Sequence, residues 1–180
     1  MRIPRDNTAA LIIDVQERLF PHMQDHDILV SNMGILIRGM QIMKIPLIVT
    51  QQYSKGLGKT IDAVEKLFVP FTHVEKTAFS CCDEPGVIDV LESTRKDFII
   101  LAGIESHVCV LQTALDLLER GFKPVLIEDC VSSRKRDDKT TAIQRMGKEG
   151  VIITSYESIL FELCRFSGTP EFKEISSLVK

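Results

Sequence analysis

Residues 97–109 read DFIILAGIESHVC, an apolar run that ends at a glycine and continues into a loop with a cysteine. The residues that follow, Val108–Arg120, place apolar side chains every three or four positions and stop at Gly121. The stretch therefore predicts a buried strand, a short loop and an amphipathic helix in direct succession. Such a unit is typical of α/β folds with a parallel sheet.

The same alternation of apolar runs and amphipathic segments extends over the whole chain. Further strands are expected at Thr8–Val15, Ile45–Thr50 and Pro124–Glu128, with weaker candidates at Thr72–Glu75 and Gly150–Thr154. Further helices are expected at Asp27–Lys44, Asp137–Glu149 and Ser155–Arg165. Strands that are apolar almost throughout need a cover on both faces. We therefore expect a three-layer α/β/α fold with a six-stranded parallel sheet and right-handed crossovers, in one domain over residues 1–180.

Composition narrows the functional classes. The 180 residues include 22 basic and 25 acidic side chains, a balance that argues against a nucleic-acid partner. No apolar run reaches 18 residues, so neither a membrane span nor a signal peptide is expected. Five cysteines without a C-x-x-C motif indicate neither a disulfide framework nor a zinc ribbon, and they favour a cytoplasmic location.

Three reactive side chains follow predicted strands. Asp14 ends the first strand, Lys76 follows the third, and Cys109 opens the helix after the fourth. Ligands of open α/β sheets bind beyond the carboxyl ends of the strands, so these residues are expected to converge. A cation and a helix N-terminus favour a thiolate, which predicts that the pKa of Cys109 falls below about 8.5. Asp14 is expected to accept the thiol proton and to return it to a leaving group.

The segments GIESHVCVLQTALDLLERGF, IIDVQERL and VEKTAFS resemble the isochorismatase-like cysteine hydrolase family. The resemblance implies an Asp14–Lys76–Cys109 triad and hydrolysis of a small-molecule amide through a thioester, without a cofactor. It also implies a cis peptide bond at Ile104–Glu105, with the backbone amides of Glu105 and Cys109 forming the oxyanion hole. A homo-oligomer is implied as well, and the apolar segment Ile159–Phe166 is expected to offer a surface for it.

Two departures refine the resemblance. Nicotinamidases of the family carry Asp-x-His metal ligands after the second strand, where this chain has Gln51, Gln52 and Tyr53, so no metal is expected. Isochorismatases that cleave a vinyl ether lack the cysteine that is present here. The loop TQQYSKGLG instead resembles a branch of small amidohydrolases with mostly unassigned substrates. The candidate substrate contacts share a position near the predicted strand ends: Gln16, Leu19, Phe20, Gln51 and Phe79.

Two other functional classes compete with a hydrolase. The string GLGKT suggests a phosphate-binding loop, but Tyr53 stands where that loop requires its first glycine. A catalytically silent oligomeric scaffold, or a small-molecule binding protein of the same fold, remains the alternative. Alone, Cys109 would be interpreted as a buried packing residue, as would Cys81, Cys82, Cys130 and Cys164.

Overall fold

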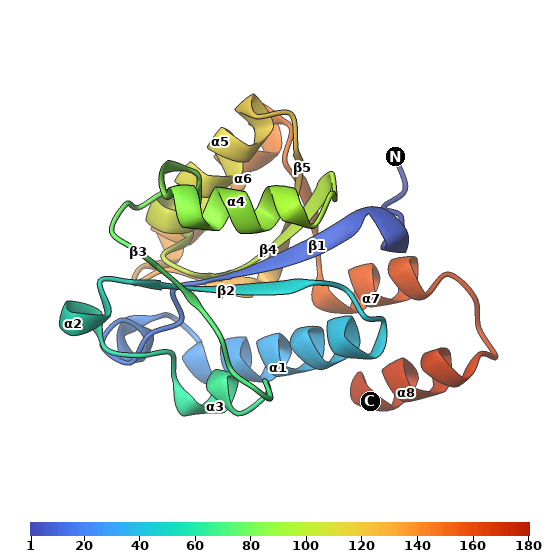
Figure 1. Ribbon diagram of the computed structural model, residues 1–180. Helices are drawn as coiled ribbons and strands as arrows, with labels where there is room; N and C mark the ends of the chain where they lie inside the picture. The colour runs from blue at the N-terminus through green and yellow to red at the C-terminus, as the bar shows by residue number, and fades with distance from the viewer.

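A computed structural model describes residues 1–180. Six parallel strands form one sheet in the order β3-β2-β1-β4-β5-β6 (Figure 1). Their bounds are Thr8–Ile13 (β1), Leu47–Gln52 (β2), Val74–Lys76 (β3), Phe98–Ile104 (β4), Lys123–Ser132 (β5) and Ile152–Thr154 (β6). The predicted α/β architecture with a six-stranded parallel sheet is confirmed.

Helices cover both faces of the sheet (Figure 1). One face carries α1 (His26–Ile42), α3 (Asp62–Glu65), α7 (Tyr156–Cys164) and α8 (Pro170–Leu178). The other carries α4 (Pro85–Ser93), α5 (Leu111–Glu119) and α6 (Arg136–Glu149). The short α2 (Ser54–Leu57) follows β2, a π-helical turn (Ser106–Val110) precedes α5, and 3₁₀ turns lie at Arg5–Asn7, Phe20–His22 and Cys81–Asp83.

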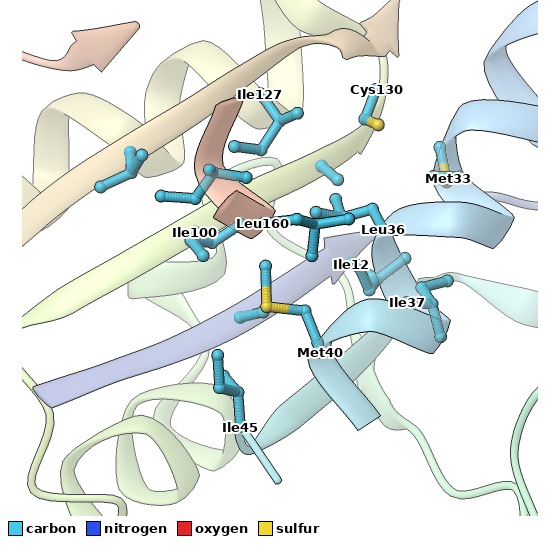
Figure 2. Close-up of a cluster of buried hydrophobic side chains, with 14 of the residues drawn as sticks. Ile12, Met33, Leu36, Ile37, Met40, Ile45, Ile100, Ile127, Cys130 and Leu160 are labelled. Carbon is cyan, nitrogen blue, oxygen red and sulfur yellow. The ribbon is translucent and has the colours of Figure 1, made fainter. Parts of the chain in front are cut away.

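Strand residues alternate between two apolar cores because successive side chains point to opposite faces. Figure 2 shows the core beneath α1, where Ile12, Ile100 and Ile127 of the sheet lie among side chains of α1 and α7. Leu160 of α7 packs directly over Gly39 of α1, where an added Cβ would come within 2.4 Å of it. The second core, beneath α4, α5 and α6, contains Cys109 and therefore adjoins the predicted site.

The structure differs from the sequence prediction at several element ends. β1 stops at Ile13 because Asp14 turns into the left-handed region, with φ 52°. β2 instead continues through Gln52, two residues into the predicted loop. Two nine-residue helices, α4 and α8, were not predicted.

The unpredicted α8 changes the interpretation of Ile159–Phe166. Phe161 lies with its ring centroid 6.0 Å from that of Phe172 on α8, and Ile159, Leu160 and Leu163 are buried. Of this segment only Phe166, 68% exposed, is a large exposed hydrophobic residue. The expected apolar surface is therefore smaller than the sequence suggested. None of the helices combines the length and the apolar character that crossing a bilayer demands.

Candidate active site

Three segments at the carboxyl edge of the sheet bring Asp14, Lys76 and Cys109 together. Asp14 follows β1, Lys76 is the last residue of β3, and Cys109 lies in the π-helical turn between β4 and α5. Their exposed fractions are 0%, 1% and 2%, so all three are shielded from water. The convergence that was expected from the strand ends is thus present in the fold.

Asp14 and Lys76 form a buried ion pair. Lys76 Nζ lies 2.7 Å from Asp14 Oδ2 and also donates to the carbonyl oxygens of Ala78 (2.8 Å) and Phe79 (3.0 Å). The other carboxylate oxygen, Oδ1, accepts a hydrogen bond from Thr50 Oγ1 at 2.8 Å. Burial is the largest single influence and lowers the pKa of Lys76, but the charge of Asp14 together with the neighbouring Cys81 and Cys109 outweighs it, so the pKa is raised and the amine stays charged.

The thiol of Cys109 lies beside this pair. Its Sγ donates a hydrogen bond to Gln52 Oε1 at 3.3 Å. Burial, followed by the negative charge of Asp14, raises the pKa of Cys109, and the charge of Lys76 only partly opposes them. The predicted fall of the pKa below 8.5 is therefore wrong, because loss of water penalises the thiolate more than one paired cation favours it. Cys109 is therefore a neutral thiol next to a carboxylate at rest.

The turn that carries Cys109 follows a close approach between two strands. Gly103 pairs with Ile13 of β1 and has φ 143°. A Cβ at Gly103 would lie 2.3 Å from the carbonyl oxygen of Ile13, so only glycine fits there. The tight contact fixes β4 against β1 next to Asp14.

The predicted cis bond at Ile104–Glu105 is wrong, since the only cis peptide bond lies at Val69–Pro70. Glu105 instead adopts φ 60° and ψ 58°, which turns the chain with a trans bond before it. A trans bond is favoured over cis by about 2.5–4 kcal/mol outside X-Pro pairs, and the left-handed residue supplies the reversal of direction.

An ion-pair network holds the outer side of this turn. Arg134 binds the Glu105 carboxylate through Nε (3.1 Å) and Nη2 (3.2 Å). His107 Nδ1 lies 2.9 Å from Ser133 Oγ, so its ring is engaged with the segment after β5. The network ties the turn that carries Cys109 to the loop that leads into α6.

The five candidate substrate contacts fall into three groups. Gln16 is fully buried, and its side-chain amide is hydrogen-bonded to the backbone. Its Nε2 donates to the carbonyls of Gln52 (3.0 Å) and Gly58 (2.7 Å). Gln51 donates to Thr60 Oγ1 at 3.0 Å. Leu19 and Phe20 pack against the core beneath α1. Phe79 alone is exposed, at 55%. Its backbone carbonyl accepts a hydrogen bond from Lys76.

Thr50 and Gln52 also contact the site, through Asp14 and Cys109, and were not predicted from the sequence. Strand periodicity places both side chains on one face of β2 and Gln51 on the other. The predicted strand ended at Thr50, so this alternation was not extended to Gln52. A third neighbour is Cys81, whose pKa is raised to about 12, mainly by burial and then by the charge of Asp14.

A cavity of about 420 Å³ lies away from Asp14, Lys76 and Cys109. Its lining includes Gln24, Asp129 and Lys139, in the region between β5, α6 and the turn before α1. Asp14, Lys76 and Cys109 are all buried, whereas Tyr53 and Phe79, on neighbouring segments, are exposed. No cluster of three or more His, Cys, Asp or Glu side chains is arranged to hold a metal ion.

Comparison with known proteins gives a consistent result. Residues 8–158 match the family model described as "Isochorismatase domain". "Isochorismatase domain-containing protein 1" of Salmo salar is 37% identical over 96% of this chain, which spans only 61% of that relative's length. "Isochorismatase family protein 1B" of Dictyostelium discoideum is 35% identical, with 99% of this chain and 89% of the relative covered.

A solved structure is similar over nearly the whole chain. The "MAR1 Ribonuclease" of Caenorhabditis elegans superposes with a TM-score of 0.92 at 38% identity, and 99% of this chain and 92% of that chain are covered. Sequence and structure thus point to the same group of proteins.

Proposed function

The chain belongs to the isochorismatase family, and on that premise we propose that it hydrolyses a small amide with Cys109 as the nucleophile. The observation that carries the proposal is the buried thiol beside the Asp14–Lys76 ion pair. A nucleophile next to a base that is itself held by a third group is the arrangement of covalent catalysis.

Acylation begins with a proton transfer, because burial raises the pKa of Cys109 and its thiol is neutral at rest. Cys109 Sγ attacks the amide carbon while its proton passes to Asp14. Because the two events are simultaneous, no buried thiolate has to form before the attack. Asp14 then donates this proton to the departing nitrogen, the C–N bond breaks, and ammonia or an amine leaves a thioester on Cys109. Lys76 stabilises the negative charge that moves between Asp14 and the sulfur.

Deacylation repeats the sequence with water. Asp14 accepts a proton from the attacking water, the C–S bond breaks, and the proton returns to Sγ as the carboxylic acid leaves. The backbone amides of Glu105 and Cys109 are our candidates for the oxyanion hole, because both lie at the start of the helical segment that ends with α5. Glu105 keeps this role in the proposal with a trans bond before it.

We also propose that residues 1–180 act as one hydrolase domain and that copies of this domain associate into a homo-oligomer. The five cysteines are all free, which supports a reducing compartment such as the cytoplasm. Phe79 is the best placed of the five candidate substrate contacts, and Gln16 and Gln51 are assigned to bracing the end of β2.

A panel of small primary amides, assayed for ammonia release, tests the function. We expect turnover of at least one amide, abolished in Cys109→Ser and Asp14→Asn and retained in Cys164→Ser, a matched control on α7. A mass increase on Cys109 during turnover would identify the thioester. Turnover that survives in Cys109→Ala would contradict the mechanism.

Two other outcomes separate the alternatives. Binding of a panel amide without any release of ammonia would favour the silent scaffold or binding protein. Because the similar protein of Caenorhabditis elegans is named a ribonuclease, RNA cleavage should be assayed as well. The net charge of -3 and the fully buried nucleophile favour a small substrate over a polyanion, so we expect no RNA cleavage.

A further inference from the structure

Gln52 accepts a hydrogen bond from the thiol group of Cys109, and the proposed mechanism does not use this contact. Its Oε1 accepts the thiol hydrogen at 3.3 Å, while its Nε2 is 3.5 Å from the carbonyl oxygen of Thr77. That carbonyl can only accept, so the amide nitrogen faces Thr77 and the amide oxygen faces the sulfur. The thiol is the single donor to Gln52 Oε1 in the resting site.

The backbone at Gln52 is held firmly, so the side chain is presented from a fixed point. Gln16 Oε1 accepts from the Gln52 N–H at 2.8 Å, and Gln16 Nε2 donates to the Gln52 carbonyl at 3.0 Å. In the sheet Gln52 is also paired with Lys76 of β3. This bracing places the carboxamide between the strand that supplies Lys76 and the turn that supplies Cys109.

Loss of the thiol proton changes what Gln52 Oε1 faces. Once Asp14 holds the proton, this oxygen has no donor and lies against a sulfur that carries negative charge or a new covalent bond. A buried acceptor that loses its only donor is costly, so another N–H or O–H group has to reach it. The group nearest to the sulfur at that moment is the substrate itself.

We propose that Gln52 selects substrates whose scissile nitrogen carries a hydrogen, by exchanging the thiol hydrogen for the substrate N–H at Oε1. The exchange frees the thiol hydrogen to move to Asp14 only when such a substrate is present. The substrate class is therefore primary amides and secondary amides, and esters or tertiary amides with the same acyl group are rejected. This inference rests on the proposed function and specifies its substrate class.

The test compares an amide with an ester of the same acid. Acetamide and methyl acetate differ at the leaving group, and the rate at which each acylates Cys109 can be followed by intact-protein mass spectrometry. Gln52→Leu removes the acceptor at similar size, and Gln112→Leu on the exposed face of α5 is the matched control. We expect the amide-to-ester ratio of acylation rates to fall at least tenfold in Gln52→Leu and to stay within twofold in the control.

A second readout does not depend on turnover. The S–H stretching band of Cys109, identified by its absence in Cys109→Ser, should shift in Gln52→Leu because the thiol loses its acceptor. Circular dichroism confirms that each variant is folded.

An equal loss of amide and ester acylation in Gln52→Leu would overturn the proposal, since it would mean that Gln52 only positions the thiol or turns its N–H toward the sulfur. An unshifted S–H band would overturn it as well. If Cys109→Ala still hydrolyses acetamide, the proposed function itself fails. A Cys109-dependent reaction whose amide-to-ester ratio is unchanged in Gln52→Leu would overturn the proposed selectivity and leave the proposed function intact.

Discussion

The buried ion pair between Asp14 and Lys76 should be visible as a large coupling energy in a double-mutant cycle. At a separation of 2.7 Å and an effective dielectric constant of about 20, two unit charges attract each other by about 6 kcal/mol. Burial of both charges offsets much of that attraction, whereas removal of one partner leaves the other charge unpaired in the interior. We therefore expect Asp14→Asn and Lys76→Met each to lower the free energy of unfolding by about 3–5 kcal/mol.

The double variant should be much more stable than the two losses added together would suggest. Both the single Lys76→Met and the double variant lose the bonds to the Ala78 and Phe79 carbonyls, so these bonds cancel in the cycle. The remaining coupling energy is expected to be about 2–3 kcal/mol. Urea unfolding followed by far-UV circular dichroism measures it, since the chain contains no tryptophan for fluorescence.

The partly exposed pair Arg5–Glu171 is the control for this cycle. Its side chains are 29% and 42% exposed, and solvent screening should limit the coupling in Arg5→Met and Glu171→Gln to about 1 kcal/mol or less. Additive losses at Asp14 and Lys76, within about 0.5 kcal/mol, would refute the view that the two residues act as a unit.

Four further outcomes are expected. Gly103→Ala should lower the free energy of unfolding by at least about 1–3 kcal/mol in urea titrations, because its Cβ meets the Ile13 backbone; an unchanged midpoint would contradict the close approach. The folded-state pKa of Cys81, about 12, exceeds the unfolded value of about 8.5. The stability that the Cys81 thiol contributes is therefore complete below pH 8.5, and above it the free energy of unfolding falls by about 1.4 kcal/mol per pH unit. Urea midpoints between pH 7.5 and 10 should therefore fall less steeply in Cys81→Ala, and parallel slopes would count against this. Dialysis against EDTA should leave ammonia release unchanged, whereas restoration of lost activity by zinc would show that a metal takes part. Light scattering should give a multiple of 20.3 kDa, and a monomer at micromolar concentration would rule out the oligomer.

The sequence predicted most of the fold because the strands are apolar almost throughout. Runs such as TAALII in β1 and FIILAGI in β4 need helices on both faces, and the rule that sites follow strand ends then selects Asp14 and Cys109. The nine-residue helices α4 and α8 were not predicted, although α4 buries Val87, Ile88 and Leu91 at helical spacing. Their positions depend on tertiary packing, as the contact between Phe161 and Phe172 illustrates.

The electrostatics of the site could not be predicted from residue types. Lys76 and a helix N-terminus suggested a thiolate at Cys109, but the pKa depends on how much water the fold excludes and on how close Asp14 lies. The contact of Gln52 with Cys109 was not predicted for a related reason. A strand that continues two residues further turns one glutamine toward the sulfur and its neighbour toward Thr60.

The contact between Gly103 and Ile13 has a consequence for how mutations in this chain should be interpreted. Gly103 has no side chain and takes no part in any proton transfer, yet the space for a methyl group is missing at the point where β4 passes Asp14. In a saturation mutagenesis screen for activity, this position should therefore tolerate as few replacements as the triad itself. Intolerance to substitution alone would not separate residues that react from the backbone that aligns them.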